Sequence, residues 1–165
     1  MGKLELVTET EYLSIYSPHI DGEEYNEFEQ FMLNYKDLDN PILQKDFKSV
    51  VLLINQMLSE CGARENLFRI EGRNIRAVPL LIQGRSKKYG TLRLYCIRIS
   101  DKLMIIGRGG IKTVRRYQDD SYLNAIVEEL KSIEHHIFLE ARKCGIEYDD
   151  YHRMKKILER IEIHN

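Results

Sequence analysis

Large apolar residues recur at helical spacing in two stretches in the first third of the chain. In residues 23–35 they lie on one side of a predicted helix, opposite acidic residues, and the same period of 3.6 returns over residues 42–61. Gly62 directly follows the second stretch, as is typical of a helix end. Ahead of both helices, residues 12–16 alternate apolar and small polar side chains, which predicts a first strand that Pro18 closes.

The hydrophobic period then changes from 3.6 to 2. Residues 67–81 are predicted to be extended, with a bend around 72–74, and residues 91–100 have the clearest strand pattern in the chain. A turn at 101–102 leads into a further apolar strand at 103–106. This region therefore predicts sequential, hairpin-connected strands.

Two more helices are predicted in the last third of the chain. Asp120 and Ser121 precede a long apolar stripe that ends at Gly145, and Asp150 precedes a shorter stripe. The predicted order is β-α-α-β-β-β-α-α in a single domain covering residues 1–165. Helices grouped outside a run of strands favour an α+β fold, with a mostly antiparallel sheet of about four strands and two helices on one face.

The charge distribution is uneven, although the net charge is only −1. Residues 66–116 carry 13 lysines and arginines against two acids, whereas the segments on either side are acidic. Such a basic segment indicates an anionic partner, either a nucleic-acid backbone or an acidic protein. No apolar run reaches the length that crosses a bilayer, and the first residues include acids and lack a signal-peptide core, so we expect a cytoplasmic protein with no membrane partner.

Several familiar kinds of catalytic or metal site find no support in the sequence. Residues 107–110 are rich in glycine, but no GK[ST] follows, so a bulge or strand end is expected there and not a phosphate-binding loop. His135 and His136 are adjacent and would point about 100° apart on a helix, which does not suit one metal ion. The cysteines form no CxxC pair and are expected to be reduced core residues: Cys61, Cys96 and Cys144. No metal or cofactor is expected.

The order of residues in the basic segment carries a family resemblance. Arg93 lies near the start of a strand, an acid-bearing turn and an apolar strand follow, and a cluster of lysine and arginine then precedes Tyr117. This arrangement resembles the RelE/ParE toxin superfamily, most closely its mRNA endonucleases of the RelE and HigB type. The motif covers about residues 67–122. The β-α-α-β-β-β order extends the resemblance to a core of about 10–122, leaving 123–165 as a C-terminal helical extension.

The resemblance implies specific roles. Arg93 matches the arginine of the family's third strand, Lys112 with Arg115 or Arg116 matches the basic cluster after the last strand, and Tyr117 matches a C-terminal tyrosine. The catalytic residues are thus expected to be Arg93, Lys112, Arg115 and Tyr117. Nucleic-acid contacts are expected from Arg69, Arg73, Arg76, Arg85, Lys87, Lys88, Arg108 and Arg116.

The function that the resemblance implies is a toxin of a type II toxin–antitoxin system that cleaves ribosome-bound mRNA without a metal. Its expected partners are a cognate antitoxin, mRNA on the ribosome, and a second copy of the chain contacted through the C-terminal helices. Two alternatives stay open: a non-catalytic protein of RelE fold that binds nucleic acid or an acidic protein, and a gyrase inhibitor of ParE type.

Alternation along residues 91–100 predicts where such a site lies. If Leu92 and Leu94 face the first two helices, Arg93 and Tyr95 emerge on the opposite face of the sheet. Ile97 and other apolar residues share that second face. The site is therefore expected at the strand end nearer Gly90, with the C-terminal helices as candidates to cover the rest.

Overall fold

The computed structural model describes residues 1–79 and 90–164. Within them, the strands are β1 (Gly2–Glu9), β2 (Ser14–Ile20), β3 (Arg69–Ile70), β4 (Ile75–Val78), β5 (Thr91–Ser100), β6 (Leu103–Lys112) and β7 (Glu162–Ile163). The helices are α1 (Glu27–Tyr35), α2 (Pro41–Gln56), α3 (Ser121–Cys144) and α4 (Tyr151–Arg160). A π-helical turn (Met57–Cys61) continues α2, and short 3₁₀ turns (Glu65–Leu67 and Tyr117–Asp119) precede β3 and α3. The α+β class predicted from the sequence is confirmed.

The described strands form one sheet in the order β3-β4-β5-β6-β2-β1-β7. Neighbours are antiparallel except β2 and β6, which run parallel where Ser14 pairs with Leu103 and Tyr16 with Ile105. The expectation of about four strands was wrong, because β1, β7 and the two-residue β3 widen the sheet at its edges. The sheet is mixed, with a single parallel pair among its described strands.

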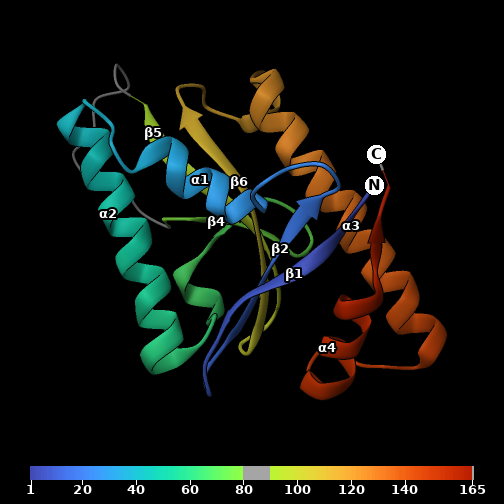
Figure 1. Cartoon of the computed structure of the whole chain (residues 1–165). Helices are drawn as coiled ribbons and strands as arrows, with labels where there is room; N and C mark the ends of the chain where they lie inside the picture. The colour runs from blue at the N-terminus through green and yellow to red at the C-terminus, as the bar shows by residue number, and fades with distance from the viewer. Residues whose placement is uncertain (80–89, 165) are drawn as a thin grey trace.

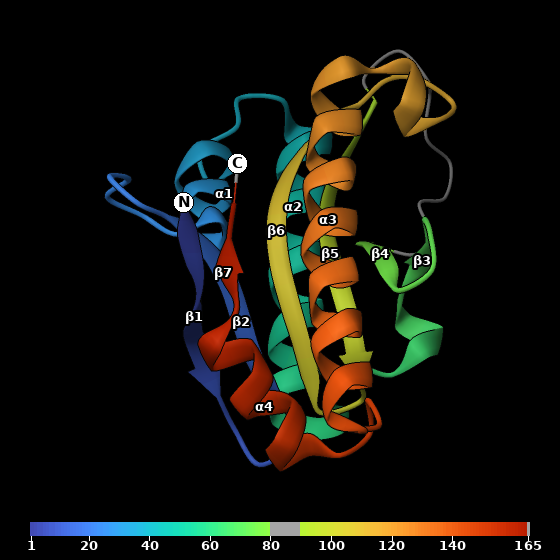
Figure 2. The same cartoon turned by 90° about the vertical axis from the view of Figure 1, so that its right-hand side faces the viewer.

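Helices cover both faces of this sheet. Figure 1 shows α1 and α2 on one side and α3 and α4 on the other, and Figure 2 shows α3 and α4 lying in front of the strands. The two faces carry separate hydrophobic cores, one built with Phe31, Phe47 and Val50, the other with Leu130 and Ile157. The prediction of two helices on one face therefore holds for α1 and α2, while the C-terminal helices form a third layer.

The helix ends follow from local sequence. Asn26 caps α1 in a capping box with Glu29, so the helix begins later than the apolar period alone predicts. Asn40 caps α2, Asp120 accepts a hydrogen bond from the third residue of α3, and Gly145 ends α3 in the left-handed conformation. These polar and glycine signals fix the ends of the elements to within a few residues.

The N-terminal hairpin departs from the prediction. β1 was not foreseen, and β2 runs to Ile20 with Pro18 inside it, so Pro18 does not close the strand. In the described residues, β6 pairs with β2 only from Ser14 to Tyr16, which leaves Pro18 unpaired on that side. A residue without an N–H is tolerated in such an edge-like position.

Glycines let β6 lie between two helices. The strand continues through residues 107–110, and its register with β5 shifts between the Leu94–Gly109 and Cys96–Ile106 pairs, so the expected bulge is confirmed and the alternative of a strand end was wrong. A Cβ at Gly109 would lie 2.4 Å from the Arg93 carbonyl oxygen and 2.6 Å from the Phe31 ring, and a Cβ at Gly110 would lie 2.9 Å from Leu123. The segment therefore serves close packing of α1 and α3 against opposite faces of β6.

The alternation along β5 is confirmed. Leu92 and Leu94 belong to the core beneath α1 and α2, whereas Tyr95, Ile97 and Ile99 belong to the core beneath α3. Arg93 consequently points to the α3 face of the sheet, at the end of β5 where that strand begins.

Candidate functional site

Arg93 and Lys112 share one face of the sheet at the same strand end. Arg93 pairs with Gly110 of β6, and a Cβ added at Gly110 would point toward Leu123 of α3. Lys112 follows two residues later and therefore lies on the same face. Both side chains are buried, with relative exposures of 5% for Arg93 and 7% for Lys112. The fold thus gathers two of the four expected catalytic residues.

Two residues of the edge strand region join this pair. Arg69 pairs with Ala77, which in turn pairs with Tyr95, so Arg69 projects from the same face two strands away. The Arg69 Nε lies 3.1 Å from Oε1 of Glu71, whose side chain is buried. We call Arg69, Glu71, Arg93, Tyr95 and Lys112 the strand-end cluster.

The electrostatics of the strand-end cluster are those of crowded cations. Burial lowers the pKa of Arg93 below its usual range, and the nearby Arg69 lowers it further. Burial likewise lowers the pKa of Lys112, followed by repulsion from Arg69, while Glu71 opposes both shifts. The three cations of the cluster outnumber Glu71 and the nearby Asp46, which both oppose the shift at Arg93, so an anion placed there would be stabilised.

Several polar atoms of the cluster are buried without a partner. In residues 1–79 and 90–164, no hydrogen bond reaches Arg93 Nε, the Tyr95 hydroxyl or Oε1 of Glu71. Arg93 does donate from Nη1 to the carbonyl of Pro79. Native proteins pair the great majority of such atoms. Glu71 Oε1 still has Arg69 as its ion-pair partner, so Arg93 Nε and the Tyr95 hydroxyl are the cluster atoms that suit a polar ligand.

Tyr117 lies behind the cluster rather than within it. Its ring is buried and packs edge-on against Tyr95, with the ring centroids 6.4 Å apart. The ammonium group of Lys131 lies 5.8 Å from the Tyr117 ring centroid. Tyr117 therefore connects the strand-end cluster to the core beneath α3.

The remaining predicted residues take several positions. Arg115 and Arg116 are exposed after β6, and Arg116 lies 3.5 Å from Asp119. Arg73 is exposed, with its guanidinium 4.1 Å from the centre of the Phe138 ring. Three predicted nucleic-acid contacts fall outside the described residues: Arg85, Lys87 and Lys88.

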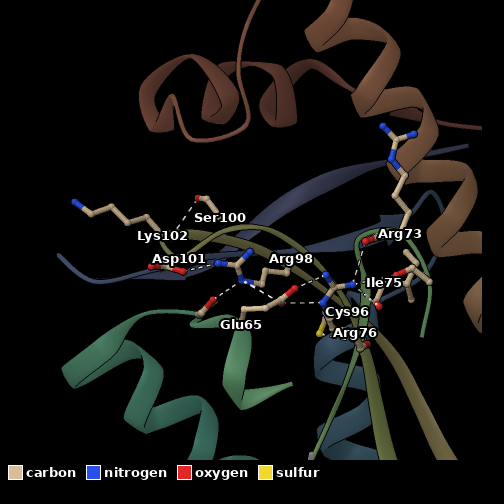
Figure 3. Close-up of polar contacts among 11 residues, drawn as sticks. Glu65, Arg73, Ile75, Arg76, Cys96, Arg98, Ser100, Asp101 and Lys102 are labelled. Carbon is tan, nitrogen blue, oxygen red and sulfur yellow. Dashed lines mark hydrogen bonds and ion pairs between the residues drawn. The ribbon is translucent and has the colours of Figure 1, made fainter. Parts of the chain in front are cut away.

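The Arg76 guanidinium makes its hydrogen bonds within the fold. Figure 3 shows its guanidinium facing Glu65, with Nε 2.9 Å from Oε2 and Nη2 2.5 Å from Oε1. Its Nη1 donates to the carbonyls of Gly72, Arg73 and Ile75. Arg76 belongs to the opposite face of the sheet from Arg93, since it pairs with Cys96, a residue of the α1/α2 core. It therefore anchors the bend between β3 and β4 and is not one of the gathered cations.

Arg108 belongs to a second polar cluster, which the sequence did not reveal. Its Nη2 donates to Glu129 of α3 at 2.8 Å, and its Nε lies 3.7 Å from Glu27 of α1. Glu27 is one of the acidic residues predicted to lie opposite the apolar side of the first helix, yet it is buried at the first position of α1. The one hint in the sequence is that Arg108 lies in a glycine-rich, apolar strand. An arginine buried there needs carboxylate partners from elsewhere in the chain.

Comparisons with known proteins give no family assignment. No protein-family model matches the chain, and neither curated proteins nor solved structures provided a match. Over the described part of the chain, no helix is long and apolar enough to cross a membrane, and no group of three or more potential ligands among His, Cys, Asp and Glu is placed to hold a metal ion. The functional argument therefore rests on the two polar clusters.

Proposed function

We propose that this protein is an endoribonuclease toxin of the RelE type that binds the RNA backbone at the strand-end cluster and cleaves it without a metal. The observation that carries the proposal is the convergence of Arg69, Arg93 and Lys112 at one strand end, with Glu71 paired to Arg69. The run of β2, α1, α2, β4, β5 and β6 supports it, because this is the element order that the family resemblance implies.

The proposed chemistry uses the RNA's own 2′-hydroxyl as nucleophile. Its oxygen attacks the adjacent phosphorus and the bond from phosphorus to the 5′ oxygen breaks, leaving a cyclic phosphate and a 5′-hydroxyl that takes its proton from solvent. Lys112 accepts the 2′-hydroxyl proton, a role that its lowered pKa favours. Arg93 and Arg69 stabilise the charge that develops on the phosphate oxygens, which the planar guanidinium fork matches.

Access to the cluster comes from the end of the sheet. Arg93 and Lys112 are buried, whereas 42% of the Arg69 side chain is exposed, so Arg69 marks the open side. The exposed Arg115 and Arg116 extend the positive surface beyond β6. An acidic segment of a cognate antitoxin would cover the same cations, which is how we propose the toxin is restrained.

A second candidate function is favoured by the burial of the central cations. Because Arg93 is buried and donates to the Pro79 carbonyl, it stabilises the fold whether or not it also meets a phosphate. A non-catalytic protein that binds nucleic acid or an acidic partner through the exposed Arg69, Arg115 and Arg116 fits that observation.

The test is cleavage of RNA by purified protein, mapped by primer extension on ribosome-bound and free mRNA. Arg93→Ala is expected to lower the cleavage rate by about a hundredfold or more. Lys112→Met is expected to remove the rise in rate with pH, because the unprotonated amine accepts the proton. Arg153→Ala is the matched control, since Arg153 is an exposed arginine of α4.

Folding of each variant is checked by circular dichroism and thermal unfolding, with Arg93→Lys as a milder replacement that keeps the charge. Folded Arg93→Ala and Lys112→Met proteins that cleave RNA at the wild-type rate would contradict the catalytic proposal. Steeply salt-dependent RNA affinity without cleavage in the wild type would support the second candidate instead.

A further inference from the structure

A pocket opens where β2 and β6 stop running side by side. In the described residues their pairing ends at Tyr16 and Ile105, although β2 continues to Ile20 and β6 to Lys112. Figure 2 shows the two strands diverging toward the end of the sheet where the termini lie. The pocket has a volume of about 640 Å³, within the range of small-molecule sites. We call it the inter-strand pocket.

Three charged residues from three elements line this pocket: Glu27 from α1, Arg108 from β6 and Glu129 from α3. The Arg108 guanidinium is held by Glu129 at 2.8 Å and lies 3.7 Å from Glu27. Glu27 is 97% buried, since its relative exposure is 3%. Bringing three distant parts of the chain together at buried charges is costly unless the charges are compensated.

The compensation is incomplete. Within residues 1–79 and 90–164, Oε1 of Glu27 and Nε of Arg108 are buried and have no hydrogen-bond partner. Arg108 gives its shorter contact to Glu129 and lies 3.7 Å from Oε2 of Glu27, so Oε1 is the oxygen of Glu27 that Arg108 does not reach. A buried carboxylate oxygen that lines a pocket without a donor is the position where a ligand donor belongs.

The chemistry of the walls selects the ligand. The described residues that line the pocket include four glutamates, Glu27 and Glu129 together with Glu23 and Glu162, against one arginine, Arg108. Their excess negative charge disfavours an anion. No group of three or more His, Cys, Asp or Glu side chains in the described chain is placed to hold a metal ion. Aliphatic side chains complete the walls, at Ile20, Ile133, Leu139, Ile161 and Ile163.

We propose that the inter-strand pocket binds an organic cation, a primary amine or guanidinium on an aliphatic stem, whose charged end donates to Glu27 and whose stem packs against the aliphatic walls. This site is separate from the strand-end cluster and does not depend on RNA cleavage. The same chemistry belongs to a free amine and to a lysine or arginine side chain of a peptide, and both are tested below.

Cation binding is linked to release of a proton. Burial raises the pKa of Glu27, and its hydrogen bond with Glu129 raises it further, against the opposing attraction of Arg108. Around the same pocket lie the acids Glu23 and Glu162, and the histidines His135, His136 and His164. A bound cation favours the ionised form of Glu27, so Glu27 gives up its proton when the ligand enters.

The experiment is isothermal titration of the full chain with agmatine, which carries both a guanidinium and a primary amine. Titrations in phosphate and in Tris, buffers with different ionisation enthalpies, count the protons exchanged. We expect saturable binding with release of about one proton per agmatine near neutral pH. A blocked tripeptide with a central arginine forms the second arm: binding of agmatine alone identifies a free cation, and binding of the tripeptide as well identifies a peptide side chain.

Glu27→Gln is the decisive variant, because glutamine has the shape of the protonated acid that the folded protein already accommodates. It is expected to weaken agmatine binding at least about tenfold and to abolish proton release. Glu128→Gln is the matched control, since Glu128 is the neighbour of Glu129 on α3 but pairs with Lys131 outside the pocket. Wild-type affinity in a folded Glu27→Gln protein, or no binding of either probe at millimolar concentration, would overturn the proposal.

Discussion

Replacing Gly109 by alanine tests how tightly β6 is held between its two helices. An added Cβ would lie 2.4 Å from the backbone carbonyl oxygen of Arg93 and 2.6 Å from the Phe31 ring. Neither contact is relieved by a side chain swinging away, because one neighbour is backbone in the adjacent strand and the other is a buried ring of α1. Overpacking of this kind costs about 1–3 kcal/mol, and the upper end applies where backbone must move.

The net loss of stability is smaller than this, because alanine also reduces the conformational entropy of the unfolded chain. Alanine restricts the unfolded state and stabilises a protein by about 0.4–1 kcal/mol where it fits without strain. We therefore expect Gly109→Ala to lower the free energy of unfolding by about 2 kcal/mol. For a chain of this size that corresponds to a fall of about 4–8 °C in Tm.

Urea unfolding followed by circular dichroism measures the change, with an unchanged slope as evidence that the unfolded state is the same. Gly72→Ala is the control, because the nearest atoms to its added Cβ lie 3.6 Å away and it is expected to be neutral or slightly stabilising. If Gly109→Ala unfolds at the same midpoint as Gly72→Ala, the packing of Phe31 against β6 is not as close as described.

Three further outcomes follow from buried or paired side chains. Hydrogen bonds from Lys155, Ser14 and Tyr151 lower the pKa of Glu9 to about 2. The stability that ionised Glu9 contributes is therefore present above the ordinary carboxyl pKa and is lost as pH falls toward 2. Glu9→Gln should flatten this fall in stability at acidic pH. The pKa of Glu27 is raised, so stability should fall as pH rises above the ordinary carboxyl pKa, and Glu27→Gln should remove that fall in denaturation measured across pH. Cys96 is fully buried and its pKa is raised, so Ellman's reagent should modify the exposed Cys144 in the native protein and reach Cys96 only after unfolding.

The predictable part of the fold is the part encoded locally. β5 runs over residues 91–100 as its alternating pattern predicts. Gly62 ends the π-helical turn that continues α2, and Gly145 ends α3. β1 was missed although Lys3-Leu4-Glu5-Leu6 alternates polar and apolar side chains, so a signal for this strand is present in the sequence. The two-residue β7 has no pattern of its own and exists because it pairs with β1 at the sheet edge.

The sequence predicted the face of the sheet from which Arg93 projects, but not the burial of Arg93 or its neighbours. Alternation along β5 places Arg93 on the face opposite Leu92 and Leu94, and the structure confirms it. Its burial depends on α3 lying across that face, which is a tertiary contact that no local pattern contains. Likewise, the partners of Arg108 come from α1 and α3, and only the folded chain brings Glu27 and Glu129 to it.

The pairing of β1 with β7 at one edge of the sheet has a consequence for how the chain emerges from the ribosome. Gly2 pairs with Ile163, so the outermost ladder waits for the last part of the chain. At about 5–20 residues per second, synthesis of residues 121–163 takes roughly 2–9 s after β6 has been made. During that interval the apolar face that α3 and α4 later cover stays open in the nascent protein, with Tyr95 and Ile97 exposed. A nascent-chain chaperone that binds apolar segments can act during those seconds. If the ribosome stalled before α3 was synthesised, that face would stay uncovered.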